Sequence, residues 1–389
     1  MRKEINTLFA LIRNAVLGEE MSEEAKQEAG HEAELLYKMA RHHDMAHLLD
    51  YAYKISGISV SDENVAFEFI KQNAMSVMRY ENLNLALVNI SELLEKEGIP
   101  FIPLKGAVIR NFYPEPWMRT SCDIDILVHE EDLDRAEKAI VEKLGFTSKG
   151  VRDYHDVSLY SEDDVHLELH FNIKENRNNV DTLLTRVWDY ALPKNNGSYE
   201  YVLTNEFFMF QIAAHLSYHV AGGGCSIRNF LDMYLLKNKL ELDESKLCSM
   251  LEICGIKTFY YESLRMSEVW FGDGEHDETT LLYQKYLLDG GVYGTKKNQI
   301  AASRRKKSKV SYILSRIFMP YEHLVITYPG LKGKKYLSPI YQLRRWCRIA
   351  FGGRIGYASK EISLNNDMSE KNKDDVSLLF EKIGLESLY

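Results

Sequence analysis

Apolar residues recur at helical spacing along residues 1–98. In residues 22–55, leucine, methionine and alanine follow one another at steps of three and four, which is the period of an amphipathic helix. Ser22 precedes two acidic residues, a typical helix start. Gly98 follows a second long apolar pattern that begins near residue 63, and glycine is a typical helix stop. The pattern therefore predicts a helical N-terminal region.

From Ile99 onward, strand-like and helix-like patterns alternate, which is typical of an α/β or α+β unit. Alternating polar and apolar side chains with β-branched residues indicate strands, and two prolines close together indicate a loop. The predicted elements are a strand at 99–104, a helical segment at 106–113, a loop at 114–117, a strand at 123–128, an amphipathic helix at 130–146 and a β-hairpin at 156–173.

Beyond about residue 180 the chain is again predicted to be helical. Helices are expected at 204–221, at 227–240 and over much of 243–290, followed by shorter helical pieces and a helix near the C-terminus. The four expected regions are an N-terminal helical region (1–98), a core (99–180), a helical region that packs on the core (181–290) and a basic C-terminal region with an acidic helical tail (291–389).

Charge is unevenly distributed along the 389 residues. The net charge is −9, yet the segment 296–354 contains fifteen lysines or arginines and one acid, Glu322. Such a segment either folds against an acidic surface of the same chain or contacts an external polyanion. Tyrosines and a tryptophan are interleaved with the basic residues, a composition that can hold single-stranded RNA by charge and stacking. Both readings remain open on sequence alone.

The five cysteines are scattered and never spaced as CxxC, so neither a disulfide framework nor a zinc site is indicated. The sequence has no stretch approaching the roughly 20 apolar residues that cross a bilayer. The N-terminal apolar run is interrupted by Arg13 and Asn14 and lacks the small-residue cleavage site of a signal peptide. We therefore expect a cytoplasmic protein with no membrane association.

Two aspartates share one face of the predicted strand 123–128. Residues two apart point the same way in a strand, so Asp123 and Asp125 face one side while Ile124 and Ile126 face the other. Two carboxylates at this spacing repel each other unless a positive group lies between them, and magnesium is a frequent one. The alternative is an acidic strand end exposed to water, so the motif alone is weak.

A third carboxylate strengthens the metal hypothesis. In "VHLELHF" successive side chains point to opposite faces of a strand. His166, Glu168 and His170 share one face, and Val165, Leu167 and Leu169 share the other. If this strand lies beside strand 123–128, three carboxylates converge, which is the minimal ligand set for two-metal phosphoryl or nucleotidyl transfer. Upstream, Gly106 ends a strand and begins a helix, where backbone N–H groups can approach a phosphate, and Lys105 could neutralise its charge. Without the acids, Gly106 would be an ordinary turn.

Taken together, "GIPFIPLKGAVI", "MRTSCDIDILV" and "LELHF" resemble the nucleotidyltransferase superfamily of DNA polymerase β. They are most similar to a mostly uncharacterised bacterial branch with an LKG turn, an Arg-x-x-x-DID strand and a Glu-x-His strand. The resemblance implies an α+β fold, with a nucleotidyltransferase core containing a small mixed β-sheet and helical regions on both sides. It also implies an enzyme that transfers an NMP from an NTP to an acceptor hydroxyl.

The resemblance also implies roles for the acids. Asp123 and Asp125 would bind two Mg²⁺ ions, with Mn²⁺ as a substitute. Glu168 would bind one of these ions and help to deprotonate the acceptor. These three residues are the expected catalytic and metal-binding set.

Nucleotide-binding residues are implied on the turn and on the approach to the Asp-x-Asp strand. Lys105 and Gly106 occupy the place of the superfamily's Gly-Ser turn, which holds the triphosphate, so a charge here replaces a serine hydroxyl. Arg119 and Ser121 are expected phosphate partners. The alternative for Arg119 is a loop arginine that caps a carbonyl or pairs with Glu115.

Two further pairs are weaker candidates. His215 and His219 are spaced to bind zinc from one helix face, but no third ligand is apparent, so zinc is not expected. Arg228 and Asp232 are four residues apart and are expected to form a helix-stabilising pair. The resemblance implies a contact with the nucleotide as their alternative role.

Two other functions remain open. A glycosyltransferase also uses an Asp-x-Asp motif with a metal, but it would need a larger nucleotide-sugar domain before the motif. A catalytically silent nucleotidyltransferase fold could instead bind RNA or a protein through the basic segment. For the enzyme, the acceptor could be a small molecule, a protein or RNA.

Overall fold

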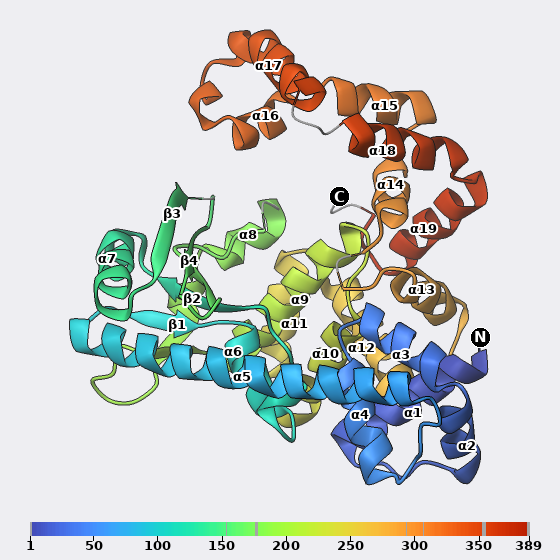
Figure 1. Ribbon diagram of the computed structural model, residues 1–389. Helices are drawn as coiled ribbons and strands as arrows, with labels where there is room; N and C mark the ends of the chain where they lie inside the picture. The colour runs from blue at the N-terminus through green and yellow to red at the C-terminus, as the bar shows by residue number, and fades with distance from the viewer. Residues whose placement is uncertain are drawn as a thin grey trace.

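A five-stranded mixed sheet lies at one end of the molecule, and helices make up most of the remainder (Figure 1). The computed structural model describes residues 2–152, 154–175, 178–292, 294–305, 307–351 and 355–386. The strands of the sheet, in spatial order, are β1 (Phe101–Pro103), β2 (Asp123–Val128), β5 (His166–His170), β4 (Asp156–Tyr160) and β3 (Thr147–Arg152). The predicted α+β class is confirmed.

The central strands set the positions of the acidic residues. Strands β2 and β5 are parallel, with Asp123 opposite His166 and Asp125 opposite Glu168. The other neighbouring strands are antiparallel, including the predicted hairpin β4–β5. Since side chains at directly opposed positions share a face of a sheet, the register places the three carboxylates side by side.

The opposite face of the sheet is covered by α5 (Glu63–Glu97) and α7 (Leu133–Leu144), as Figure 1 shows. Ile124 and Ile126 from β2 and Leu167 and Leu169 from β5 are buried in this layer. Gly98 adopts a φ of +63° and ends α5 as predicted. Alternation along the two strands thus separates a buried apolar face from a polar face, because α5 and α7 cover only one side.

Helices before and after the sheet share a second hydrophobic core. Phe9 of the first helix stacks on Trp270 with ring centroids 4.8 Å apart. The helices before α5 are α1 (Arg2–Leu17), α2 (Glu23–His31), α3 (Ala33–His42) and α4 (Ala46–Ile55). Those after the sheet are α8 (Asn178–Leu184), α9 (Asn205–Ala221), α10 (Ile227–Lys239), α11 (Glu244–Ile253), α12 (Lys257–Phe271) and α13 (Glu278–Leu288). The predicted domain limits stay a prediction.

The basic segment forms helices that lie in the upper part of Figure 1, apart from the sheet. They are α14 (Lys296–Arg304), α15 (Lys309–Ile317), α16 (Tyr321–Thr327) and α17 (Ser338–Phe351), followed by α18 (Ile355–Asp367) and α19 (Glu370–Lys382). Arg304 pairs with Glu370 at 2.9 Å and Arg316 with Glu361 at 2.7 Å. Part of the basic segment therefore folds against acids of the chain itself. Its residues 306 and 352–354 lie outside the described part.

Several short elements differ from the prediction. The two-stranded ladder of β6 (Ala191–Pro193) and β7 (Tyr201–Leu203) lies in a region predicted to be helical, and β3 was not predicted. Strands β6 and β7 have three residues each, which is too short to show a period in the sequence. Packing beside β1 fixes β7. The remaining short turns are 3₁₀ helices at Arg110–Phe112, Pro116–Met118, Glu130–Asp132, Val187–Tyr190, Pro329–Leu331 and Lys335–Leu337, with α6 at Gly106–Ile109.

Among the described helices, none is both long and apolar enough to span a membrane.

Candidate active site

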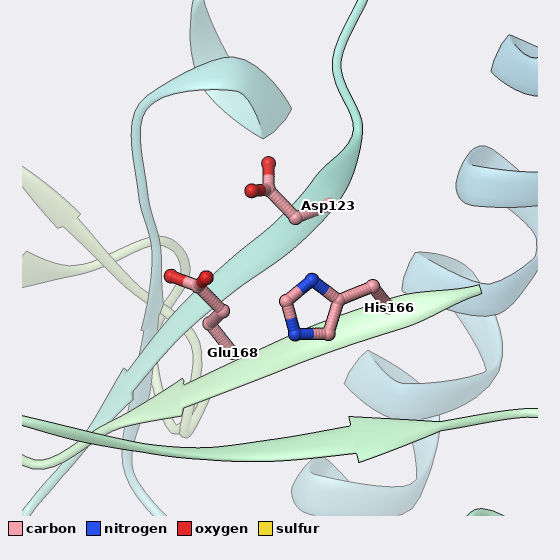
Figure 2. A group of neighbouring side chains, drawn as sticks. All are labelled: Asp123, His166 and Glu168. Atoms are coloured by element: carbon pink, nitrogen blue, oxygen red, sulfur yellow. The ribbon is translucent and has the colours of Figure 1, made fainter. Parts of the chain in front are cut away.

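The predicted acids meet on the face of β2 and β5 that α5 and α7 do not cover. Figure 2 shows Asp123 and Glu168 on neighbouring strands with their carboxylates on the same side, and His166 beside them. The atoms of Asp123, His166 and Glu168 that could ligate a metal lie within 4.8 Å of one another. The same is true of Asp125, Glu168 and His170. The structure thus brings together the three carboxylates that the sequence singled out.

The acids of this carboxylate cluster (Asp123, Asp125 and Glu168) are in unequal electrostatic states. Burial and then repulsion from Asp125 and Glu168 raise the pKa of Asp123. Burial would also raise the pKa of Asp125, but Lys105 and His170 hold it well below its usual range. A divalent cation with oxygen ligands fits this cluster, because it would relieve the repulsion at Asp123.

Lys105 and His170 both contact one oxygen of Asp125. The Nζ atom of Lys105 is 3.2 Å from Oδ1, and Nε2 of His170 is 2.9 Å from the same atom. His170 also lies 3.4 Å from Oε2 of Glu168. Both contacts are made to Oδ1 of Asp125. Lys105 and His170 could therefore hold this carboxylate in place while Oδ2 remained available to a metal.

Gly106 allows the Asp-x-Asp loop to approach the turn. Lys105 before it has a φ of +41° and a ψ of −113°, an uncommon conformation for a residue with a side chain. A Cβ atom at Gly106 would lie 2.7 Å from Oγ of Ser121 and 2.9 Å from Nη1 of Arg119. The absence of a side chain therefore serves close packing of two predicted nucleotide-binding residues, a reason the sequence did not show.

Arg119 is fixed by a partner far away in the sequence. Its Nη2 atom is 2.9 Å from Oδ2 of Asp232 on α10, and its Nη1 atom donates to the carbonyl of Thr120 at 3.1 Å. The carbonyl contact matches one predicted alternative, whereas the carboxylate partner is Asp232 instead of Glu115. Ser121 donates to the carbonyl of Asp123 at 3.1 Å. Both side chains therefore support the start of β2.

The predicted pairing of Arg228 with Asp232 is wrong. Arg228 instead lies 3.1 Å from Oδ2 of Asp44, which also accepts a hydrogen bond from Thr120 at 2.8 Å. Asp232 turns to Arg119 and to the hydroxyl of Tyr113 at 2.7 Å. Arg228 and Asp232 thus each pair with a residue from another part of the chain, Asp44 and Arg119, and not with each other.

A polar pocket of about 350 Å³ opens over this face of the sheet. It contains all seven site residues predicted from the sequence, which are Lys105, Gly106, Arg119, Ser121, Asp123, Asp125 and Glu168. It also contains residues that the sequence reasoning did not assign to the site, among them His170, Glu175 and His215. For His170 the signal was present, since alternation places it on the same face as Glu168, whereas Glu175 follows the strand and gave no signal.

A small mixed sheet with Asp-x-Asp on one strand and an acid opposite it on the parallel neighbour defines a protein of the nucleotidyltransferase fold. A family model described as "Uncharacterised nucleotidyltransferase" matches residues 29–272. The chain belongs to this family. The match includes the LKG, DID and ELH segments, but the finer assignment to a branch marked by them stays a prediction. None of the curated proteins searched matches the chain.

Substituting Gly106 by alanine is expected to destabilise the protein by about 1–3 kcal/mol, the usual cost of overpacking. The new methyl group would collide with Arg119, which cannot withdraw because Asp232 holds it. Urea unfolding would measure the loss. Gly356→Ala is the matched control, because nothing lies within 4 Å of its Cβ position. Equal stability of the two variants would contradict this packing role.

Proposed function

We propose that the protein is a metal-dependent nucleotidyltransferase that transfers an NMP from an NTP to an acceptor hydroxyl. The observation that supports it best is the parallel register of β2 and β5, which sets Asp125 opposite Glu168 and Asp123 beside them on one wall of the pocket. Carboxylates that converge in this way can hold the metal ions of a two-metal transfer site. The pocket volume falls within the range of small-molecule sites.

Each site residue has a role in this proposal. Asp123, Asp125 and Glu168 hold Mg²⁺ or Mn²⁺. The bound cations would polarise the acceptor hydroxyl and neutralise the triphosphate. Lys105 and Arg119 place positive charge on the same pocket and orient the phosphates, while Gly106 and Ser121 fix the turn beside them. Five free thiols are compatible with the cytoplasmic location we propose.

A labelling screen tests the proposal. The full-length protein is incubated with each α-labelled NTP and Mg²⁺ or Mn²⁺, together with small-molecule extract, RNA or protein as acceptor. Label transferred to one acceptor class, with loss of transfer in EDTA, is the expected result. If a UDP-sugar raised the melting temperature of the protein more than any NTP did, the result would instead indicate a glycosyltransferase. An absence of metal-dependent NTP binding would overturn the proposal.

RNA binding by the basic segment is a second candidate, supported by exposure. Lys332, Lys334 and Lys335, between α16 and α17, are exposed next to Tyr336, whose exposed fraction is 77 %. Exposed cations beside an aromatic ring suit single-stranded RNA.

Replacing Lys332, Lys334 and Lys335 together by glutamine is expected to weaken binding of a labelled single-stranded RNA and to reduce its dependence on salt. Fluorescence anisotropy at several salt concentrations would measure both. Lys38→Gln with Lys138→Gln and Lys246→Gln, three exposed lysines elsewhere, is the control. Unchanged binding in the first variant would remove this candidate.

A further inference from the structure

A chain of three side chains outside the carboxylate cluster lines the same pocket. Glu175 follows β5, and His215 and His219 lie one turn apart on α9. The Nδ1 atom of His215 is 2.7 Å from Oε1 of Glu175, and its Nε2 atom is 3.0 Å from Nε2 of His219. The contacts run from a carboxylate through one imidazole ring to the next.

The protonation states along this chain are set by its surroundings. Burial would raise the pKa of Glu175, but His215 and then Lys105 lower it to about 2, so the carboxylate is ionised at neutral pH. Burial lowers the pKa of His219 to about 3, so that ring is neutral. An ionised carboxylate only accepts hydrogen bonds, so Nδ1 of His215 carries a proton. In neutral His215, Nε2 is therefore the basic atom, and it accepts the N–H of His219.

The geometry favours proton transfer over metal binding. Glu175 contacts the Nδ1 edge of His215, whereas His219 faces the Nε2 atom, so the three donors do not converge on one point. Within the described residues, the close groups of three possible ligands are formed by β2 and β5. A carboxylate that orients an imidazole ring on the wall of a pocket is the arrangement of a general base.

Lys105 connects this chain to the carboxylate cluster. Its ammonium group is 3.2 Å from Asp125 and is also near enough to Glu175 and His219 to influence their ionisation. All of these side chains, with Glu168 and His215, line the one pocket. An acceptor molecule placed beside a nucleotide in this pocket would therefore meet α9.

We propose that His215 is the general base that removes the proton from the acceptor hydroxyl, and that Glu175 is a positioning residue that holds its ring. The step requires the nucleotidyl transfer proposed above and assigns proton removal to His215 instead of Glu168. The acceptor hydroxyl takes the place of the His219 N–H at Nε2 of His215. As the proton passes to Nε2, the acceptor oxygen forms a bond to the α-phosphorus. The bond from this phosphorus to the bridging oxygen breaks, and pyrophosphate leaves with the electron pair.

The test compares His215→Gln with the wild type and with His31→Gln, a control at an exposed histidine. Pyrophosphate release and NTP affinity are measured separately, with Mg²⁺ and either the acceptor from the screen or water as the nucleophile. The expected result is a loss of turnover of about 10²–10⁴-fold, typical of a lost general base, with NTP affinity retained. His215→Ala should regain turnover with added imidazole, which a structural role would not allow.

Glu175→Gln tests the role of Glu175. The amide keeps the size of the side chain but lacks the charge that orients Nδ1 of His215, 2.7 Å from Oε1. Turnover should therefore decrease while NTP affinity is retained, a split that a purely structural role would not give. Turnover at the wild-type level would argue against Glu175 as the positioning residue.

The outcomes separate this inference from the proposed function. Metal-dependent turnover that persists in His215→Gln would overturn the inference and leave the nucleotidyltransferase standing. The inference would also be overturned if His215→Gln lost NTP affinity together with turnover and imidazole did not restore turnover in His215→Ala. His215 would then have a binding or structural role. A wild-type protein without metal-dependent NTP binding or turnover would overturn both.

Discussion

Replacing Asp123 and Asp125 together by asparagine is expected to abolish metal-dependent NTP binding and turnover while the fold is retained. Loss of an outer-sphere partner alone costs about 10–100-fold in metal affinity, so loss of two direct ligands should exceed that range. The substitutions keep the volume of the side chains, and at position 125 the amide oxygen can still accept a hydrogen bond from Lys105. The charge that Asp125 offers to Lys105 and His170 is lost, so the variant should be folded but less stable than the wild type. Because Asp123 is repelled by its neighbours, the loss of its charge does not remove a stabilising contact.

The measurement is NTP binding and pyrophosphate release with and without Mg²⁺, beside circular dichroism for the fold. Asp163→Asn with Asp164→Asn is a matched control, because these aspartates are also adjacent to a strand but are exposed at the β4–β5 turn. Asparagine also tolerates the φ of +58° at Asp164. Turnover that survives in the Asp123/Asp125 variant would refute the proposed function, and loss in the control would show a general effect of charge.

Strand periodicity predicted which face each acid of the carboxylate cluster occupies, but not that the two strands are neighbours. Side chains alternate along a strand whatever the rest of the fold does, so DIDILV and HLELH already placed Asp123, Asp125 and Glu168 on the polar faces of their strands. Adjacency of the two strands was a condition of the three-carboxylate hypothesis, and the parallel pairing of β2 and β5 fulfils it. The same alternation placed His166 and His170 on the face of Glu168, but it gave them no role in the site.

Partners distant in the sequence could not be predicted in this way. Asp232 is 113 positions from Arg119, and only the packing of α10 against the loop before β2 brings them together. The sequence offered the local alternatives Glu115 and Arg228, which have the right charge at short range. Helix packing decided between them, because buried partners are held in place more firmly than pairs on a helix surface.

The contact between Arg119 and Asp232 leads to a second large expected effect, on stability. Asp232→Ala should lower the free energy of unfolding by about 3–5 kcal/mol, the usual cost of removing one partner of a buried ion pair. The side chains of Arg119 and Asp232 are only 11 % and 3 % exposed, so water cannot replace the lost carboxylate. Tyr113 would lose its acceptor as well. Urea unfolding would measure the change.

Asp189→Ala is the matched control for Asp232→Ala, since Asp189 pairs with Arg186 and both side chains are more than half exposed. An exposed pair contributes about 0–1 kcal/mol, so this control should stay close to the wild type. Asp232→Asn should fall between the two, because the amide oxygen can accept one hydrogen bond but offers no charge to Arg119. If Asp232→Ala were as stable as the control, Arg119 would have another partner in solution, and its position over the pocket would not depend on α10. A large loss would instead show that a helix far along the chain fixes the arginine proposed to orient the phosphates.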